Sequence, residues 1–401
     1  MADVRPFRAI RPADALAADV IAPPYDVIDE EEAREIARNR RSFVRVTRPE
    51  VDLPAGTDAH SQEAYEKARE NLEAFLADGT LIRDEAPTYY FYGQVMGAHR
   101  QVGILAAASV AEYDAGTLKK HEYTRPDKED DRTHHMEVLD AQVGLVFLTY
   151  RATPTLAALT ASVTAAPPAW RVTTDDGVEH ALWPAPAGVV ESIRQAFDAI
   201  PELYIADGHH RSAAASRVHA NRKDAPSAHF LAGLFPDDAL CVMAYNRVVH
   251  DLNGLSQDAF LQAVGEHFEL APTDAPVPTE RGTFTMYLDG AWQLLTPKPG
   301  VVPTDDPVAS LDVAVLQDRV LGPLLGIDDP RRSTRITFVG GIRGPEALAR
   351  AVDRGAAVAF HLVPTGLDQL FAVADAGEVM PPKSTWFEPK LREGVVGKML
   401  R

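Results

Sequence analysis

The sequence predicts an α/β protein, α+β over part of its length, because strand-like and helix-like segments alternate through most of its 401 residues. An amphipathic helix is indicated over 61–78, a β-hairpin over 88–110, and a regular alternation of helices and strands over 309–375. With 46% hydrophobic and 24% charged residues, the chain has the composition of a globular protein with a substantial core.

The expected elements follow in order along the chain. An acidic run, Asp29 to Glu32, begins a helix after an extended Pro-Pro stretch, since carboxylates favour a helix N-terminus. In the helix over 61–78, apolar residues recur on one face, and Gly79 suits the position after its end. Further helices are expected over 189–199, 309–321, 345–353 and 367–375. Strands are expected over 88–95, 101–110, 143–150, 203–206, 240–249, 335–339 and 357–362, with a small hairpin over 282–295.

Charge and cysteine content exclude several classes of protein. The formal net charge of −18 argues against non-specific binding to DNA, RNA or an anionic membrane, so neither nucleic acid nor membrane is an expected partner. Cys241 is the single cysteine, which rules out an intrachain disulfide and a multi-cysteine metal site. There is no signal core and no run of about 18 apolar residues, so we expect a cytoplasmic protein.

The most informative motif is the strand-to-helix corner Asp207-Gly208-His209-His210-Arg211. The first N–H groups of a helix lack partners and its dipole end is positive, so such a start attracts anions. Gly208 lets a phosphate approach the backbone, and Arg211 can bind phosphate oxygens through two N–H groups. The motif predicts a phosphate site. The alternative is an ordinary turn with a solvated basic corner.

Two further clusters carry candidate chemistry. The charged run from Lys119 to Arg132 lies between two apolar strands, where a long charged loop is often functional, although most charge runs are solvated surface. Within it, Glu122 is flanked by His121 and Tyr123, is expected to be partly enclosed, and could deprotonate a substrate hydroxyl. The other cluster, Lys383-Ser384-Thr385, follows two stiffening prolines. It is either an anion or carboxylate clamp or a C-terminal loop that packs through its aromatic residues.

A metal site built on histidines is a competing interpretation. Its candidate ligands are His121, Glu122, His134, His135, His209 and His210. None of them has the i, i+4 spacing of a helical two-histidine site, and adjacent histidines point apart on a helix or a strand. Magnesium carried by phosphates is favoured, because such a site needs few protein ligands.

The corner resembles the phosphate-binding box of the ParB-like fold, in particular that of the free-serine kinases, which phosphorylate L-serine with ADP or ATP. Over about 115–395 the shared features keep the same order. They are the pair His121-Glu122, the corner itself, a hairpin that begins Arg281-Gly282, and Gly377-Glu378-Val379 before Pro382-Lys383-Ser384-Thr385. The whole chain is also similar to a prokaryotic family of unknown function labelled partition-protein-like, including its segments 22–28 and 120–129.

The resemblance implies a role for each matching residue. Glu122, with His121, would act as the catalytic base on the substrate hydroxyl. The nucleotide phosphates would be held by Asp207, Gly208, His209, His210 and Arg211, with Asp207 also a magnesium ligand. Lys383, Ser384 and Thr385 would bind the substrate. The implied activity is a phosphotransferase that uses ADP or ATP with Mg²⁺ and acts on free L-serine or a related hydroxy amino acid.

The expected organisation has three parts: an N-terminal α+β region over 1–112, a ParB-like core over 113–270, and a C-terminal α/β lobe over 271–401 that closes the substrate site. The N-terminal region has no counterpart in the kinases, so it would alter the pocket or build a homodimer. After Thr385 the kinases continue with Arg-His, whereas this chain has Trp386-Phe387. Part of the substrate-binding residues of the kinases is therefore missing here. Two alternatives stay open: a nucleotide-binding regulatory module without turnover, and a metal-dependent hydrolase.

Overall fold

The computed structural model describes residues 1–401 and divides the chain into two compact units. Unit 1 contains Met1–Leu240 and Pro389–Arg401, and unit 2 contains Cys241–Glu388. These units differ from the three segments expected from the sequence, because strands from both sides of residue 112 share one sheet: β5 (His99–Ser109) pairs with β12 (His229–Pro236). The α/β class is confirmed.

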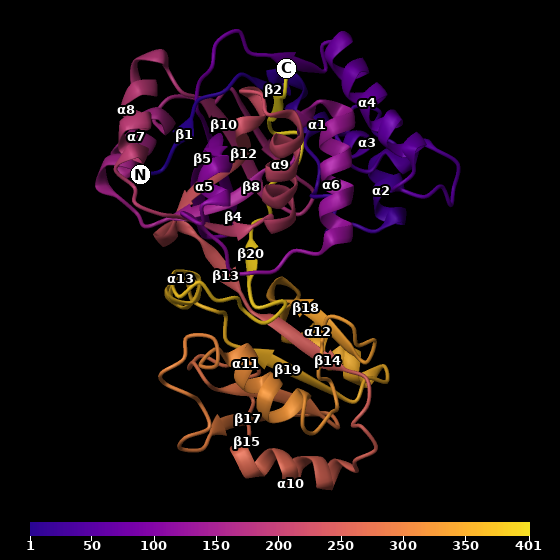
Figure 1. The fold of residues 1–401 in the computed structure, drawn as a ribbon. Helices are drawn as coiled ribbons and strands as arrows, with labels where there is room; N and C mark the ends of the chain where they lie inside the picture. The colour runs from indigo at the N-terminus through magenta and orange to yellow at the C-terminus, as the bar shows by residue number, and fades with distance from the viewer. The chain divides into compact units, whose positions relative to one another are not determined.

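Unit 1 is built around a nine-stranded mixed sheet (Figure 1). Its strand order is β6-β11-β8-β12-β5-β4-β10-β9, and β1 pairs with the last part of β5. The β6–β11 and β8–β12 pairs are parallel, whereas the other pairs are antiparallel. The remaining bounds are β1 Val4–Arg5, β4 Tyr90–Met96, β6 Leu118–Lys119, β8 Val146–Tyr150, β9 Trp170–Thr173, β10 Glu179–Pro184 and β11 Leu203–Asp207.

Four helices cover one face of this sheet: α5 Val110–Asp114, α7 Pro154–Thr164, α8 Ala187–Asp198 and α9 His209–Arg222. Successive side chains of a strand point to opposite faces, so Val146 and Leu148 of β8 enter the same apolar cluster. Ala214 and Val218 of α9 reach that cluster from one helical face. The packing fixes α9 on the sheet directly after β11 ends.

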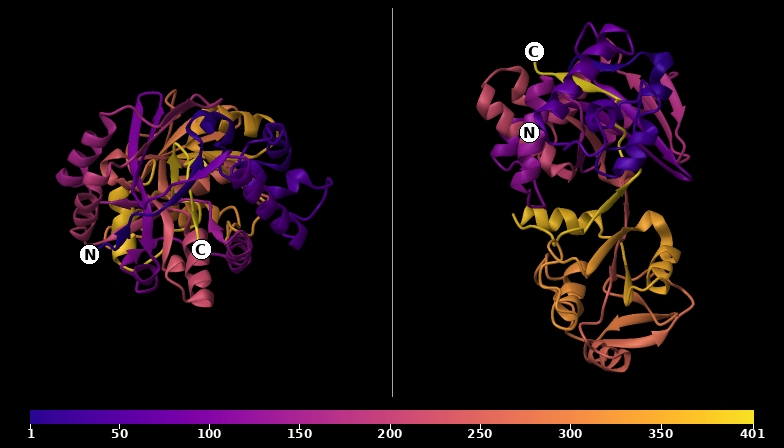
Figure 2. Two further views of the ribbon diagram at one scale, coloured as in Figure 1. Left: turned by 90° about the horizontal axis from the view of Figure 1, so that it is seen from above. Right: turned by 90° about the vertical axis from the view of Figure 1, so that its right-hand side faces the viewer.

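A second layer of unit 1 contains a four-stranded sheet in the order β3-β2-β21-β7. The C-terminal strand β21 inserts between β2, from the N-terminal segment, and β7. The yellow C-terminal end of the chain thus returns to the part of the molecule that contains the indigo N-terminal segment (Figures 1 and 2). Helix α6 lies between α4 and α9 (Figure 1). The bounds in this layer are β2 Ala9–Pro12, β3 Leu81–Arg83, β7 Ala141–Gln142, β21 Gly397–Met399, α1 Ala17–Val20, α2 Glu30–Ile36, α3 Val44–Thr47, α4 Gln62–Ala77 and α6 Pro126–Leu139.

Unit 2 contains a six-stranded antiparallel sheet in the order β15-β17-β16-β19-β14-β18, and a separate pair, β13 with β20. Helix α12 packs on the larger sheet through Leu348, which joins Val248 and Ala359 in one apolar cluster. Helix α11 (Asp312–Leu316) continues into the π-helical turn η5 (Gln317–Leu321). The other bounds are β13 Cys241–Met243, β14 Tyr245–Val249, β15 Phe268–Pro272, β16 Phe284–Leu288, β17 Ala291–Pro297, β18 Ile336–Gly340, β19 Val358–Leu362, β20 Trp386–Glu388, α10 Gln257–His267, α12 Gly344–Asp353 and α13 Leu367–Asp375.

The main difference from the expected elements lies in the charged run over 119–132. Its second half is not a loop, because Pro126 begins helix α6. Proline suits the first turn of a helix, and Asp127 and Glu129 favour its positive end. Asp131, which the interpretation of this run as solvated surface would expose, is 7% exposed and is bonded to Tyr65 and Arg132. In this fourteen-residue helix Asp131 lies in the second turn and faces other residues of unit 1 rather than solvent, which corrects that interpretation for Asp131.

Candidate functional site

Gly208 sets the geometry of the corner between β11 and α9. Its φ of 93° and ψ of 27° lie in the left-handed region, which side chains disfavour. A Cβ at this position would lie 3.3 Å from the Cα of Val146 on the neighbouring strand β8. Glycine therefore permits both the turn and its close approach to the sheet. Because Gly208 has no side chain, it caps none of the N–H groups of α9.

The start of α9 offers donors for an anion. The N–H groups of Arg211 and Ser212 already donate to the Gly208 carbonyl, at 3.0 and 3.1 Å. Those of His209 and His210 come earlier in the first turn, where a helix supplies no acceptor. The preceding Asp207 accepts a hydrogen bond from the Gly208 N–H at 2.7 Å and lies 3.6 Å from the ammonium of Lys390.

Asp207 carries a negative charge beside this positive helix end. Burial opposes its ionisation, but Lys390, Arg211 and the Gly208 N–H together lower the pKa of Asp207 below its usual value. The carboxylate is therefore ionised at neutral pH and can act as an oxygen ligand for a hard cation such as Mg²⁺.

The two histidines of the corner clamp the segment that carries Glu122. The backbone N–H of His121 donates to His209 Nε2 at 3.5 Å, and that of Arg125 donates to His210 Nε2 at 3.1 Å. Both imidazoles thus accept hydrogen bonds from the backbone of the segment 121–125. With its Nε2 accepting, His209 carries its proton on Nδ1, which lies 3.8 Å from Glu122 Oε2. The structure therefore brings Glu122 to the start of α9.

Burial keeps the imidazoles of His121 and His209 uncharged. His121 and His209 are 3% and 4% exposed, and their rings meet edge to face with centroids 4.6 Å apart. Desolvation lowers the pKa of His121 to about 4. Desolvation, reinforced by the neighbouring His121, lowers the pKa of His209 well below its usual value. Glu122 itself is more open than the sequence suggested, with 45% of its side chain exposed, so a substrate can reach it from solvent.

The clamp predicts one tautomer for His209. Since the His121 N–H occupies Nε2, ¹⁵N NMR of the imidazoles should show a neutral ring protonated on Nδ1 from pH 8 down to about pH 5. The exposed His250 provides the reference resonance in the same spectra. Protonation of both ring nitrogens of His209 at pH 6 would contradict the clamp.

Arg211 is held beneath the corner. Its Nη1 donates to the Leu145 carbonyl at 2.6 Å, and its stem packs over Gly144, where a Cβ would lie 3.2 Å from Arg211 Cδ. Arg211 Nη2 lies 3.8 Å from the carboxylate of Asp26. Burial disfavours the charge, but Asp26 and the phenolic oxygen of Tyr25 outweigh it and raise the pKa of Arg211 above its usual value.

Three residues that sequence reasoning missed complete this environment: Tyr25, Arg132 and Glu393 line a small cavity of about 20 Å³ with Arg211. The guanidinium of Arg132 lies 4.2 Å from the centre of the Tyr25 ring. Glu393 is 5% exposed, and burial raises its pKa to about 7 although Arg211 and Arg132 favour its ionised form. The segment 22–28 was a sequence signal for Tyr25, but nothing local marked Glu393, which comes from the far end of the chain.

Because of Glu393, the free energy of unfolding is expected to decrease as pH rises. The pKa of Glu393 is about 7 in the folded state and 4.5 without burial. The contribution of protonated Glu393 to the free energy of unfolding is therefore fully present below pH 4.5 and is lost as pH rises through 7. Relative to Glu393→Gln, the wild type should lose on the order of 2 kcal/mol of unfolding free energy between about pH 5 and pH 8. Urea titrations at both pH values measure it. The exposed Glu63→Gln is the control, and equal pH slopes for Glu393→Gln and wild type would contradict the assignment.

The remaining candidate residues are in the second compact unit. Lys383, Ser384 and Thr385 belong to unit 2, and the hydroxyl of Ser384 donates to the Pro381 carbonyl at 2.6 Å, so this side chain holds its own loop. The binding role of the three residues stays a prediction.

Of the residues considered for a metal, His121, Glu122 and His209 lie together, whereas His134 and His135 have other partners. His134 contacts the side chain of Gln62, whereas His135 contacts the Val46 carbonyl. No group of three or more His, Cys, Asp and Glu side chains is arranged to hold a metal ion. The geometry therefore gives no support to a histidine-based hydrolase.

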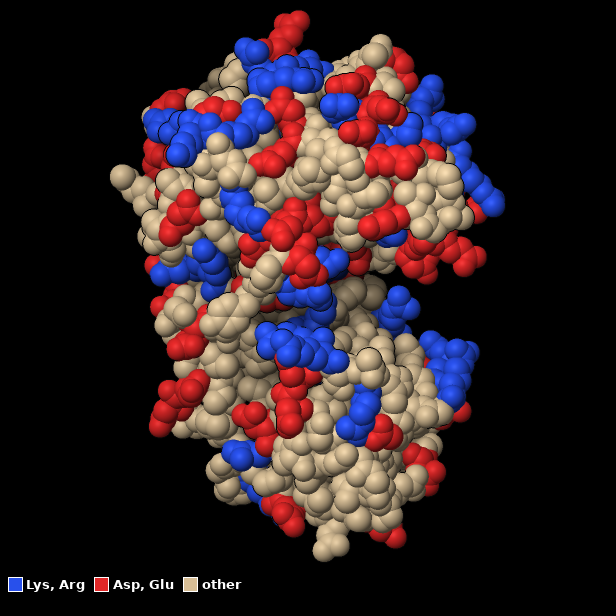
Figure 3. Space-filling view, turned by 45° about the vertical axis from the view of Figure 1, so that its right-hand side comes forward, with Lys and Arg blue, Asp and Glu red and all other residues tan.

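Surface charge is mixed. On the face that Figure 3 draws, acidic and basic side chains are interspersed rather than gathered by sign. None of the helices combines the length and apolar character needed to cross a membrane.

Residues 4–314 match a family described as protein of unknown function, DUF1015. The chain belongs to the DUF1015 family. No curated protein matches the sequence.

Among solved structures, this DUF1015 chain is similar to a free serine kinase mutant in complex with ADP, at 12% identity and a TM-score of 0.35, over 71% of this chain and 87% of the kinase. A conserved hypothetical protein from Pyrococcus furiosus matches at 11% identity and a TM-score of 0.35, over 71% of this chain and 90% of its own. SbnI from Staphylococcus aureus, truncated at its C-terminus, matches at 11% identity and a TM-score of 0.40, over 72% and 84%.

Proposed function

We propose that this chain is a small-molecule phosphotransferase that moves a phosphoryl group from ADP or ATP, with Mg²⁺, to the hydroxyl of free L-serine or a related hydroxy amino acid. One observation carries the proposal. The carboxylate of Glu122 lies 3.8 Å from His209 Nδ1 at the uncapped start of α9, on a segment whose backbone N–H groups donate to His209 and His210.

The donor side of the site is supported by the same helix start. The N–H groups of His209 and His210 and the positive end of α9 favour nucleotide phosphates, and Arg211 adds a fixed positive charge from below. Asp207 would hold Mg²⁺ as an ionised oxygen ligand, and the ion would supply neutralisation of charge on the phosphates. In this arrangement the histidine rings position Glu122, whereas their backbone N–H groups face the phosphate.

The chemical step needs a base at the acceptor. The hydroxyl proton passes to a Glu122 oxygen, and the hydroxyl oxygen forms a bond to phosphorus. The bond between that phosphorus and its bridging oxygen breaks, and the nucleotide leaves with one phosphate fewer. A partly exposed carboxylate is suited to this role, because the acceptor must reach it from solvent. Lys383 and Thr385 are proposed to bind the acceptor through the resemblance, while the Ser384 hydroxyl already bonds Pro381.

Removing the charge of Arg211 tests the nucleotide site. Arg211→Met keeps the buried stem over Gly144 but loses charge-assisted hydrogen bonds, which are each worth about 1.5–3 kcal/mol. Affinity for ADP and ATP, measured by calorimetry, should fall at least about tenfold. Arg217→Met is the matched control, since Arg217 lies on the same helix and pairs with Asp130 at 2.5 Å. A folded Arg211→Met protein with unchanged nucleotide affinity would remove the phosphate role.

Replacing Glu122 tests turnover. Glu122→Gln keeps the shape of the side chain but cannot accept the proton, so transfer to the hydroxyl should fall by about 10²–10⁴-fold while ADP affinity stays the same. Phosphorus NMR with ADP or ATP, magnesium and a panel of hydroxy amino acids measures the rate. Asp130→Asn is the control, because its carboxylate is 65% exposed; Asp131 is unsuitable, because it is buried.

Two results would contradict this reading. A Glu122→Gln protein with wild-type transfer would exclude Glu122 as the base. A wild-type protein that binds nucleotide but transfers phosphate to no acceptor would favour a regulatory module without turnover.

A further inference from the structure

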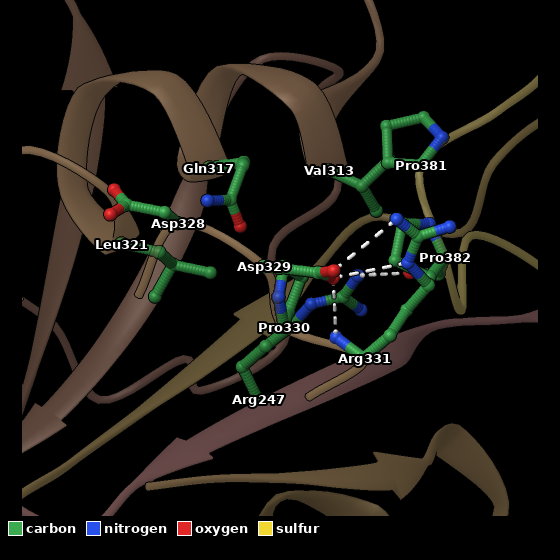
Figure 4. A pocket seen from close by; sticks show the side chains of 10 residues that line it. All are labelled: Arg247, Val313, Gln317, Leu321, Asp328, Asp329, Pro330, Arg331, Pro381 and Pro382. Atoms are coloured by element: carbon green, nitrogen blue, oxygen red, sulfur yellow. Dashed lines mark hydrogen bonds and ion pairs between the residues drawn. The ribbon is translucent and has the colours of Figure 1, made fainter. Parts of the chain in front are cut away.

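A second pocket, of about 240 Å³, is formed entirely by residues of unit 2 (Figure 4). Its walls are apolar on two sides, with Val313 and Leu321 from the α11–η5 segment and Pro381 and Pro382 from the loop before β20. Arg247 of strand β14 contributes a guanidinium to the space between them. The pocket uses none of the residues assigned to the nucleotide site.

Arg247 is an unusual residue for such a wall. It is 3% exposed, yet no Asp or Glu pairs with it. It donates to the carbonyls of Tyr245 and Pro382, the latter at 3.4 Å, and its guanidinium lies 5.1 Å from the centre of the Phe338 ring. Burial lowers the pKa of Arg247 to about 10, so it stays charged at neutral pH. Buried charges in proteins are normally paired, because desolvation without a counter-charge is unfavourable.

The carboxylates that line the pocket do not supply that counter-charge. Asp329 is bonded to Arg331, with Nε at 3.0 Å, and also lies 3.7 Å from Arg332 (Figure 4). Asp328 is exposed. The pocket therefore contains one buried positive charge that no carboxylate of the chain pairs with.

The helix that forms one wall is distorted at this place. In η5 the Gly322 N–H donates to the Gln317 carbonyl at 2.9 Å, five residues back, and the Gln317 side chain donates to the Ile327 carbonyl at 2.7 Å. Such single π-helical turns are less stable than α-helix and are frequent at functional sites. Here the wider turn carries both Gln317 and Leu321 into the pocket lining.

We propose that this pocket binds a small organic carboxylate, with the carboxylate on Arg247 and an apolar body between the proline loop and the α11–η5 segment. The planar guanidinium matches a carboxylate with two parallel hydrogen bonds. At about 30 Å³ per water, the volume equals roughly eight waters, which suits an acid of about six to ten non-hydrogen atoms. The apolar walls select against inorganic phosphate, which has no part to place on them.

Calorimetric titration of the full chain tests the proposal with 3-methylbutanoate and benzoate as probes. Their amides, 3-methylbutanamide and benzamide, have nearly the same shape without the charge. At least one acid should bind the wild type, and its amide should bind at least about tenfold more weakly. Inorganic phosphate at equal ionic strength should not compete.

Arg247→Met should weaken binding of the acid at least about tenfold while leaving ADP affinity unchanged. The two measurements therefore test the carboxylate pocket and the proposed nucleotide site separately. Arg335→Met is the matched control, since Arg335 lies in the same unit and its charge already pairs with Asp251. If Arg247→Met does not fold by circular dichroism, Arg247→Lys keeps the charge without the planar fork and should still weaken binding. The absence of acid binding to the wild type, equal binding of acid and amide, or binding unaffected by either Arg247 variant would overturn the proposal.

Discussion

The site depends on two backbone N–H groups that donate to neutral imidazoles. His209 and His210 can accept from residues 121 and 125 only while their Nε2 atoms carry no proton, and burial lowers the pKa of both rings in the direction that keeps them neutral. The apolar surroundings that make a charged histidine unfavourable thus also fix the segment that carries Glu122. The corner and the charged run, about eighty residues apart in the sequence, become one structure through this clamp.

Below the corner, buried side chains of opposite charge lie close together, so desolvation does not make all of them neutral. Arg211 stays charged because Asp26 and Tyr25 favour its cationic form, while Glu393 tends to hold a proton because burial outweighs two nearby arginines. In unit 2, Arg247 has burial without a counter-charge. These arginines are all removed from solvent, so the placement of neighbouring carboxylates decides how far each positive charge is neutralised within the chain.

Local patterns predicted the elements well. The hairpin of β4 and β5, helix α4 and the alternation of β18, α12, β19 and α13 lie within a few residues of the expected bounds, because periodicity and helix-end residues act over short distances. The charged run was harder to interpret, since a helix with many charges on one face and His135 and Asp131 on the buried face lacks an apolar stripe. Domain boundaries could not be read locally either, because β21 returns to pair with β2.

The sequence by itself determined the corner: Asp-Gly after an apolar strand and before an alanine-rich segment specifies a left-handed turn and an uncapped helix start, since φ of 93° suits only glycine there. It also indicated candidate residues at this corner and on the segment of Glu122, whose chemical roles stay predictions. Only the tertiary structure decided what each of them faces. The imidazoles turn to Glu122 and the backbone of its segment, Ser384 bonds its own loop, and Glu393 reaches Arg211 from the end of the chain. Hydrogen bonds and burial between distant segments depend on packing, which no local pattern contains.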